Sequence, residues 1–421
     1  MKKILAIIGV VVLSVGMFFA GYFCRNYTDP DLAALKFILD NYKKYYLEED
    51  ADYIEIMGDS LLDQYSDYYT KEDYDLIKKS AKGIKAGIGI SFSGTQNEYY
   101  VYKVIGNSPA ENAGVKEGGK VVGLKTPADQ DFKNLTFSEF STALGEVEVG
   151  KEISLKIDYG EQKIFTVKKQ EYQETYVYYS DASGSFRFSD VSGEMKFVPC
   201  DGNLDVTLPS DTAYIKYTAF NGLSNNLNGS VKQFSTAMKK FKDNQRSKLI
   251  LDLRGNGGGF MDIMCDVASH LIGVKGNVLV SRAIYKDGKE DKFTTSAGKY
   301  FDYDFESIVI LADEGSASAS EALIGACLDY DTLGVVKVVL SKNSKGEYKT
   351  YGKGIMQTTI ESIRGDAIKL TTAKIYWPNK DLNTCIHDVG ITKNLTAYAN
   401  KIIEAPYIEN ADYELIAALS L

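Results

Sequence analysis

The residues best able to do chemistry form a run of small residues, Gly315 to Glu321 (G-S-A-S-A-S-E), after a short apolar stretch. The apolar stretch, Ile308 to Ala312, predicts a buried strand, and the residues from Glu321 onwards predict a helix. Gly315 permits a tight turn between them. A serine at such a turn is exposed, and the free N–H groups at a helix start can stabilise an oxyanion. A nucleophilic serine is one interpretation, and an ordinary serine-capped helix is the other.

A nucleophilic serine needs a base, and histidine is scarce in this chain. Only His270 and His387 are present, and the G-x-S-x-G elbow of the α/β-hydrolases is absent. His270 ends an apolar helical stretch, which favours a structural role, and His387 lies in a predicted loop or strand edge. A lysine is the other option if burial keeps part of it neutral near pH 7. Lys353 stands between two glycines ahead of a predicted strand, where Gln357 can orient it, although a surface turn is the alternative.

A glycine-rich turn from Arg254 to Gly259 follows the strand pattern of Lys248 to Leu253. Backbone N–H groups in such a turn can bind an anion, so an oxyanion site and a phosphate site are both compatible with it. Neither G-x-x-x-x-G-K-[ST] nor a G-x-G-x-x-G that opens a helix is present, which argues against a nucleotide site.

Together these motifs resemble those of the C-terminal processing peptidases, also called tail-specific proteases. Four ordered motifs carry the resemblance: Asp252 to Gly259 (D-L-R-G-N-G-G-G), Gly315 to Glu321, Gly352 to Gln357 (G-K-G-I-M-Q) and Lys369 to Pro378 (K-L-T-T-A-K-I-Y-W-P). The residue after Asn256 is Gly257, where relatives commonly have proline.

The resemblance implies a Ser-Lys dyad, in which Ser318 is the nucleophile and Lys353 is the base, assisted by Gln357. It implies an oxyanion hole from the N–H groups of Gly258 and Ala319, with Gly259 as the neighbouring alternative. Asp329, eleven residues after Ser318, matches some family members and supports Ser318 over the adjacent serines. The implied fold is α/β, a crotonase/ClpP-like core, and no metal or organic cofactor is needed.

The N-terminus predicts the compartment. Lys2 and Lys3 precede an uncharged run from Ile4 to Cys24, which as a helix would reach roughly 30 Å and span a bilayer core. Bulky Phe23 argues against lipoprotein processing at Cys24. We expect residues 1–24 to form an uncleaved anchor rather than a cleaved signal, which places the catalytic region outside the cytoplasm at the cell membrane. That compartment and the net charge of −9 favour protein substrates and not nucleic acid, because no basic patch is available for a phosphate backbone.

The remaining chain divides into predicted segments. Residues 25–82 are predicted as helical and residues 83–170 as a PDZ domain, by resemblance, with a short helix opened by Pro109. In this domain Gly87, Ile88, Gly89 and Ile90 are expected to hold a peptide's terminal carboxylate and last side chain, while an edge strand pairs with the peptide. Ordinary core isoleucines beside a turn are the alternative.

The C-terminal half is predicted as an α/β core, because strand patterns at 213–217, 248–253 and 307–312 alternate with helix patterns such as 230–243. Residues 171–212 are expected to be an added β-rich segment with a turn at 181–184, 213–405 the peptidase core and 406–421 a tail. Ser318 and Lys353 are further apart in sequence than the resemblance implies. A polar hairpin or loop within 335–350 is expected to contain the additional residues. Cys265 and Cys327 lie in apolar helical contexts and are expected to be free thiols.

The predicted function is a membrane-anchored serine endopeptidase that reads protein C-terminal tails. Its expected partners are proteins or peptides with free C-termini, the membrane through the N-terminal helix, and a second copy of the chain as a further candidate. One alternative is a catalytically silent PDZ scaffold that binds protein tails. Another is crotonase-like acyl-thioester chemistry, which the lysine motif, the PDZ domain and the exported location disfavour.

Overall fold

The computed structural model describes residues 31, 34–38, 61–201, 204–222, 228–296, 301–409 and 411–421 of the chain. Residues Asp63–Leu421 form one compact unit, and Met1–Leu62 form another. The predicted anchor lies outside the described residues, as does most of the predicted helical segment before residue 61. Among the described residues, no helix is long and apolar enough to cross a membrane.

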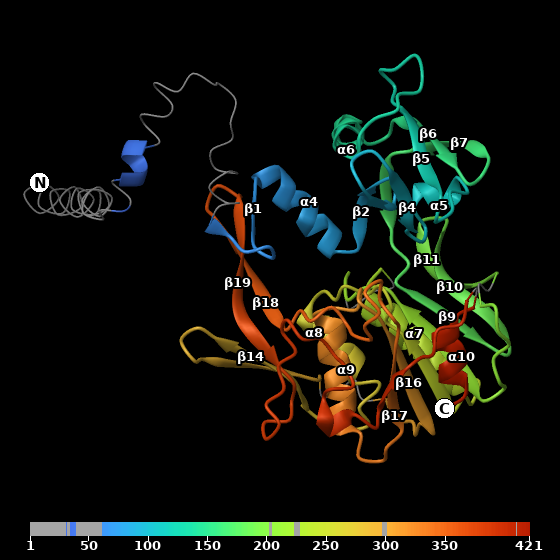
Figure 1. Ribbon diagram of the computed structural model, residues 1–421, viewed down its shortest axis with the longest axis vertical. Coiled ribbons are helices and arrows are strands. Elements are labelled where there is room, and N and C mark those ends of the chain that lie inside the picture. Colours follow the sequence, from blue (N-terminus) through green and yellow to red (C-terminus); the bar gives the residue numbers. More distant parts are fainter. Residues whose placement is uncertain are drawn as a thin grey trace, which may run out of the picture. The chain divides into compact units, whose positions relative to one another are not determined.

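The core sheet has eight strands in the described part of the chain, in the order β11-β10-β9-β12-β13-β16-β17-β20 (Figure 1). Its neighbouring parallel strands are β12 (Thr212–Tyr217), β13 (Lys248–Asp252), β16 (Ser307–Ala312), β17 (Val336–Leu340) and β20 (Ile402–Glu404). The strands predicted at 213–217, 248–253 and 307–312 are confirmed to within one residue at each end. Their near-continuous apolar sequences suit a parallel sheet that is covered on both faces.

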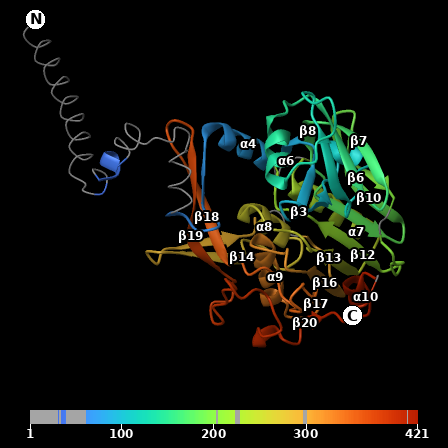
Figure 2. The ribbon, with the colours of Figure 1, turned by 45° about the horizontal axis from the view of Figure 1, so that its top comes forward.

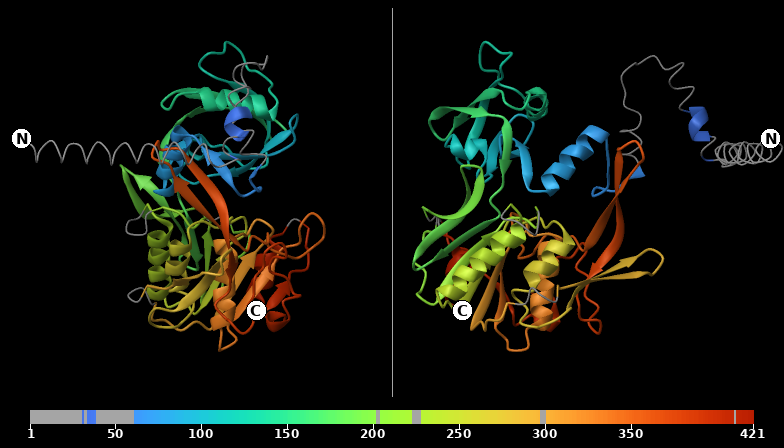
Figure 3. Two further views of the ribbon diagram at one scale, coloured as in Figure 1. Left: turned by 90° about the vertical axis from the view of Figure 1, so that its left-hand side faces the viewer. Right: turned by 180° about the vertical axis from the view of Figure 1, so that it is seen from behind.

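Helices cover both faces of the core sheet. The helices α7 (Ser230–Asp243), α8 (Met261–Ala268) and α9 (Ala319–Tyr330) pack on one face against residues that include Ile215, Leu251 and Ile310. Alternate residues of the same strands point to the other face, where they meet α10 (Tyr413–Leu419). In Figure 3 the yellow-green helix α7 runs along the strands of this sheet. Both Cys265 and Cys327 are buried free thiols, as predicted.

The predicted tail, residues 406–421, is instead part of the core. Leu415 and Ala418 of α10 are buried against Leu311 and Val339 of the sheet. The Asp412 side chain caps α10 by accepting a hydrogen bond from the Leu415 N–H group at 3.0 Å. The tail prediction is wrong because a helix of seven residues gives too short a periodic signal to reveal its buried face.

The predicted added segment, residues 171–212, is β-rich, but it is continuous with the core sheet. Its strands β9 (Val177–Asp181), β10 (Gly184–Val191) and β11 (Glu194–Cys200) extend the core sheet, since β9 pairs antiparallel with β12. The turn predicted near residues 181–184 joins β9 to β10. Likewise, part of the predicted hairpin or loop at 335–350 is the buried strand β17. The stretch after Leu340 does fold back on itself, since Lys342 forms an antiparallel bridge with Tyr348.

A second sheet carries the lysine motif. Its order is β1-β19-β14-β15, and β18 also pairs with β19 (Figure 2). The strands are β1 (Asp67–Tyr69), β14 (Leu279–Tyr285), β15 (Glu290–Thr294), β18 (Ile355–Glu361) and β19 (Ala367–Tyr376). The strand predicted after Lys353 is therefore confirmed. By contrast, residues 67–69 were expected in a helix and form a strand that pairs with β19, followed by α4 (Lys71–Ala81).

The β3–β7 module lies between α4 and the core in sequence. It contains β3 (Ile90–Gly94), β4 (Tyr99–Val104), β5 (Lys120–Lys125), β6 (Glu152–Asp158) and β7 (Gln162–Lys168), in that spatial order. The helices α5 (Pro109–Asn112) and α6 (Phe137–Glu146) belong to it, and β2 (Ile84–Gly87) pairs with β8 (Gln170–Gln173) at its ends. The short helix that Pro109 was predicted to open is confirmed, with Ser108 as its N-cap.

Candidate active site

The three serines of the G-S-A-S-A-S-E motif have different roles at the turn between β16 and α9. Ser316 and Ser320 are buried, and their hydroxyls donate hydrogen bonds of 2.8 Å to the carbonyls of Leu253 and Asn256, respectively. They therefore fasten the turn to the glycine-rich loop. Ser318 is half-buried and stands immediately before the first residue of α9. This arrangement leaves Ser318 as the serine best placed to act as a nucleophile.

Ser318 has a strained backbone. Its φ of 57° and ψ of −115° lie in a region that residues with a side chain rarely adopt. Such a conformation costs on the order of 1–3 kcal/mol and persists only where the surroundings enforce it. Here those surroundings include the Glu321 carboxylate, which accepts the Ser318 N–H at 2.9 Å. A strained residue that its surroundings hold in place is a candidate for function, and Ser318 is such a residue at this turn.

The glycine-rich loop lies directly against this turn. A Cβ placed on Gly258 would be 2.8 Å from the Ala319 nitrogen and 2.9 Å from the Ser318 Cβ, and φ at Gly258 is +96°. Only glycine fits this position. Gly258 and Ala319, predicted together as the oxyanion hole, are therefore neighbours in space.

The N–H groups of this loop differ in their hydrogen bonds. The Gly258 N–H donates to the Asn256 Oδ1 at 2.9 Å, and the Asn256 Nδ2 in turn donates to the Tyr217 carbonyl. Within the described residues, the N–H groups of Gly259 and Ala319 make no hydrogen bond. An oxyanion could thus be bound by Ala319 and Gly259 directly, or by Ala319 and Gly258 after the Asn256 amide moves. Both of the predicted alternatives stay open.

Lys353 is brought to the same site by the loop that precedes β18. The Tyr351 N–H donates to the Ser316 carbonyl at 3.0 Å, which fixes the loop to the nucleophile turn. A Cβ on Gly352 or Gly354 would meet the backbone of residues 387–390 within 3.0 Å, so both glycines of the motif permit close packing. The glycines on either side of Lys353 are therefore explained by buried backbone contacts and not by a surface turn.

Glu321 joins the serine turn to the lysine loop. It is fully buried, and its carboxylate accepts hydrogen bonds from the Ser318 N–H and the Lys353 N–H, both at 2.9 Å, through one oxygen. The other oxygen accepts from the Thr350 hydroxyl at 2.5 Å and from the Gly352 N–H at 2.8 Å. Burial raises the pKa of Glu321, and these hydrogen bonds oppose that shift. Sequence reasoning treated Glu321 only as a helix former, although the S-x-x-E spacing of a capping box pointed to it.

The Lys353 side chain is partly shielded from water. Burial lowers its pKa from the ordinary value, and repulsion from Lys369 adds to that effect, whereas Asp63 and Glu321 oppose it. The Lys353 Nζ lies 5.2 Å from the centre of the Tyr65 ring. A hydrogen bond with Tyr351 raises the pKa of Tyr65 to about 12, so this hydroxyl stays protonated at neutral pH. The lowered pKa of Lys353 is what a lysine base needs.

The contacts predicted between the dyad side chains are not formed. Among the described residues, no hydrogen bond links the Ser318 hydroxyl to the Lys353 Nζ, and the Gln357 amide donates to the Thr371 hydroxyl at 3.3 Å instead of reaching Lys353. Catalytic hydrogen bonds are often long in a structure without substrate and tighten in the complex. The structure thus brings the two backbones together and leaves the roles of Ser318, Lys353 and Gln357 as predictions.

Within the described residues, no hydrogen bond links either histidine to the Ser318 hydroxyl. His270 is buried, lies edge-to-face against Phe234 and tilted beside Phe301, and has its Nδ1 within 3.1 Å of the Asp266 carbonyl, which agrees with a structural role. The His387 Nε2 lies 3.5 Å from the Asp388 carboxylate. Asp329, at the far end of α9, accepts hydrogen bonds from the Asn379 N–H at 2.7 Å and from the Tyr398 hydroxyl. Asp329 therefore holds the end of α9 in place.

The predicted carboxylate loop lies at the start of β3. Within the described sheet, β3 is an edge strand, and the N–H groups of Ile88 and Gly89 have no hydrogen-bond partner among the described residues. Gly89 adopts φ of +78° and packs against Ser108, where no side chain fits. Ile88 is buried in the module's core, and Ile90 packs partly buried against it. Ile88 is thus a core residue, as the alternative of core isoleucines beside a turn has it, and Ile90 is the isoleucine left partly accessible for a last side chain.

Comparison with known proteins relates the site to a family. Residues 211–397, which contain Ser318, Lys353 and the glycine-rich loop, match peptidase family S41. This part of the chain is similar to the S41 peptidases. The predicted resemblance is therefore confirmed.

Sequence relatives agree with this assignment. A probable CtpA-like serine protease of Staphylococcus epidermidis is 35% identical over 203 residues, which is 46% of this chain and 38% of that protein. A carboxyl-terminal-processing protease of Synechocystis is 25% identical over 339 residues, 80% of this chain and 67% of that protein. The chain covers less than two fifths of the length of its most similar staphylococcal relatives.

Solved structures agree in fold. The photosystem II D1 C-terminal processing protease has a TM-score of 0.52 at 17% identity, with 91% of this chain and 90% of that chain covered. A putative S41 protease from Bacteroides fragilis has a TM-score of 0.51 at 16% identity, covering 89% of this chain and 92% of that one. The α/β fold predicted by resemblance is therefore confirmed as that of S41 peptidases.

Proposed function

We propose that this protein is a serine endopeptidase in which Ser318 is the nucleophile and Lys353 is the general base. One observation carries the proposal: a single oxygen of the buried Glu321 carboxylate accepts the N–H groups of both residues. The serine turn and the lysine loop, 35 positions apart in sequence, are thereby held at one site. Similarity to the S41 peptidases supports the same roles.

The chemistry follows from these positions. Neutral Lys353 takes the proton from the Ser318 hydroxyl as its oxygen attacks the scissile carbonyl carbon. The resulting oxyanion is stabilised by the Ala319 N–H and a second N–H from Gly258 or Gly259. Lys353 then gives its proton to the leaving amine as the C–N bond breaks. Water, deprotonated by Lys353, hydrolyses the acyl-enzyme and releases Ser318. Gln357 orients Lys353 once the substrate is bound.

Peptide hydrolysis by matched variants tests this assignment. Wild type, Ser318→Ala and Lys353→Ala should share one unfolding midpoint, while both variants lose cleavage of an extended fluorogenic peptide, because nucleophile and base act as a unit. Ser362→Ala, a change at an exposed serine between β18 and β19, is the matched control. Lys353→Ala that cleaves at the wild-type rate at neutral pH would refute the Ser-Lys mechanism.

The β3–β7 module is proposed to be a PDZ domain that captures the substrate's C-terminal carboxylate. The free edge of β3 can pair with a peptide strand, and the unpaired N–H groups of Ile88 and Gly89 can bind its terminal carboxylate. Gly87 and Gly89 allow the backbone to turn there, and Ile90 contacts the last side chain. Free-acid and C-terminally amidated versions of one substrate test this: amidation should raise KM at least several-fold, and equal KM values would refute tail reading.

The proposed compartment is the outer side of the cell membrane, with residues 1–24 as a single-pass anchor. The proposal rests on Lys2, Lys3 and the uncharged run to Cys24. Expression of the full chain and of a chain starting at residue 25 tests it. The full chain should stay in the membrane fraction after alkaline carbonate, and the shortened chain should not. Release of both chains by carbonate would refute the anchor.

A further inference from the structure

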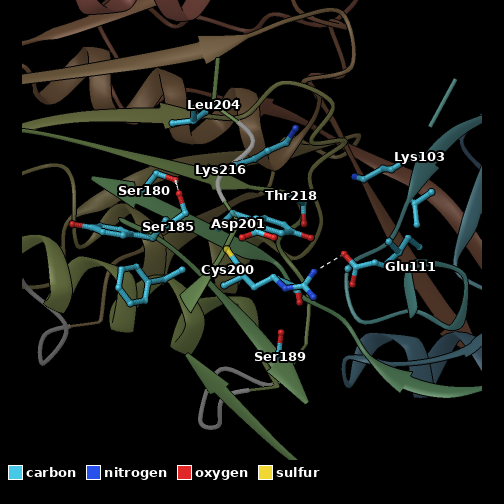
Figure 4. A pocket seen from close by; sticks show the side chains of 18 of the residues that line it. Lys103, Glu111, Ser180, Ser185, Ser189, Cys200, Asp201, Leu204, Lys216 and Thr218 are labelled. Carbon is cyan, nitrogen blue, oxygen red and sulfur yellow. Dashed lines mark hydrogen bonds and ion pairs between the residues drawn. The ribbon is translucent and has the colours of Figure 1, made fainter. Parts of the chain in front are cut away.

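A cavity of about 790 Å³ lies where the β3–β7 module meets the core sheet. Strand β4 and the α5 region form one wall, and β9, β10 and β12 form the other (Figure 4). Neither Ser318 nor Lys353 lines it. The cavity therefore does not contain the Ser-Lys pair, although Arg254 at the start of the glycine-rich turn lines it.

The acidic residues of its walls are mostly engaged. The Glu111 carboxylate on α5 pairs with the Arg187 guanidinium on β10 at 2.5 Å, so this pair joins the module to the core sheet; a dashed line leads from Glu111 in Figure 4. The Glu174 carboxylate pairs with the Lys85 ammonium at 2.9 Å, and the Asp412 carboxylate pairs with Arg254 at 2.7 Å. Among the wall acids, Glu117 accepts the Val104 N–H at 3.0 Å. These contacts neutralise or satisfy each of the four acids.

The lysines of the walls are not engaged. Lys103 on β4, Lys216 on β12 and Lys116 after α5 line the cavity, and in the described part of the chain their ammonium groups make no ion pair or hydrogen bond. Asp201 is the one wall acid without such a contact among the described residues, so three cationic groups face one uncommitted carboxylate.

Of the three lysines, Lys103 is the one whose positive charge is disfavoured by its surroundings. It is half-buried, and burial lowers its pKa, with further lowering by repulsion from Lys216 and Lys85. Glu174 and Glu117 oppose that shift without reaching ion-pair distance. A shielded ammonium without a counter-charge is costly, so an anion in the cavity would relieve this cost.

Hydroxyl groups beside the lysines suit anion oxygens. Tyr178 lines the cavity, and burial raises the pKa of its phenol, which stays protonated as a donor. The Thr218 hydroxyl also lines the cavity and donates to the Tyr176 carbonyl at 3.4 Å, so it reaches an anion only by turning away from that carbonyl. In the described residues the Tyr178 hydroxyl makes no hydrogen bond. Ammonium and hydroxyl donors around one cavity match an oxyanion, which accepts from both.

We propose that this cavity is a binding site for a small oxyanion, a carboxylate or a phosphate, held between Lys103 and Lys216. Lys103 belongs to the β3–β7 module and Lys216 to the core sheet. The bound anion links the two parts and replaces the repulsion between their lysines with attraction. Anion binding thus stabilises the arrangement in which the Glu111–Arg187 pair is closed.

The test uses the full chain carrying Ser318→Ala, so that self-cleavage does not interfere, with inorganic phosphate or citrate titrated at ionic strength held constant by sodium chloride. Calorimetry and the thermal unfolding midpoint are measured. The parent should show saturable binding and a rising midpoint with at least one anion. If only phosphate or only citrate binds, that result identifies the class of oxyanion that the site prefers.

Three further variants decide the site. Lys103→Gln and Lys216→Gln should each weaken binding at least tenfold, and Lys103→Arg should retain most of it. Lys120→Gln is the matched control, because Lys120 lies on β5 of the same module but pairs with Glu98 at 2.8 Å outside the cavity. Absence of saturable binding in the parent overturns the proposal. Equal midpoint shifts in all variants do so as well, because they indicate general salt effects or an adventitious ion only.

Discussion

Replacement of Glu321 by glutamine should separate the two halves of the active site. The carboxylate accepts four hydrogen bonds, two on each oxygen. In Glu321→Gln one oxygen becomes an NH₂ group, which faces two donors and can accept from neither. At about 1.5 kcal/mol for each lost bond to a charged acceptor, the free energy of unfolding should fall by about 3 kcal/mol.

The folded Glu321→Gln variant should also lose activity, so the fall in kcat should exceed what partial unfolding would cause. If the amide turns its NH₂ group toward Ser318 and Lys353, their backbones lose the common acceptor and separate. A misplacement of about 1 Å at a reacting group typically costs about 100-fold in rate, so kcat should fall about 100-fold with little change in KM. Urea unfolding and peptide hydrolysis, both at a temperature where the variant is folded, give the two quantities.

The matched control is Glu139→Gln. Glu139 completes a capping box with Thr136 at the start of α6, accepts its N–H at 2.9 Å and is exposed. This substitution makes the same chemical change in the same local motif and should leave kcat unchanged. The reasoning is refuted if Glu321→Gln keeps kcat within twofold of wild type while it is as well folded as the control.

Three other substitutions follow from the structure. Gly258→Ala should abolish hydrolysis, because its Cβ would lie 2.7 Å from the Ala317 carbonyl at φ of +96°; a residual rate above about 10% would contradict this. Tyr65→Ala should admit water to Lys353, and loss of shielding outweighs the lost cation–π attraction of about 0.5–1 kcal/mol. The pKa of Lys353 then rises towards its ordinary value, so the acid limb of kcat/KM moves to higher pH, whereas Tyr65→Phe should keep the wild-type limb. Leu415→Ala should lower the free energy of unfolding by about 2–5 kcal/mol in urea, because Leu415 is fully buried, and a change below 1 kcal/mol would show that α10 is not part of the core.

The sequence predicted those elements whose signal is local. The strand Ser307–Ala312 and the helix Ser230–Asp243 were predicted with their observed bounds, since each has an unbroken apolar pattern. The serine turn and the lysine loop were identified by motif, and their common family by resemblance. Local sequence could therefore identify the pieces of the site.

Contacts between distant residues were not predictable in the same way. Asp67 pairs with Lys369 through β1 and β19, which places Tyr65 over Lys353, and no local pattern near residue 65 reports such a pairing. Similarly, α10 is too short to reveal its buried face, and the four donors to Glu321 come from two separate segments. The hydrogen bond between Gly258 and Asn256 also depends on loop conformation, which the G-N-G-G-G composition leaves undetermined.

Labelling of the nucleophile tests the central claim most directly. Full-length protein is treated with a fluorophosphonate at several pH values, and the modified residue is identified by peptide mass spectrometry. We expect a single adduct on Ser318, formed faster as pH rises through the lowered pKa of Lys353. Lys353→Ala should lose the adduct, while Ser362→Ala, a change at an exposed serine between β18 and β19, keeps it. An adduct on another serine, or equal labelling of Ser318 without Lys353, would contradict the Ser-Lys dyad.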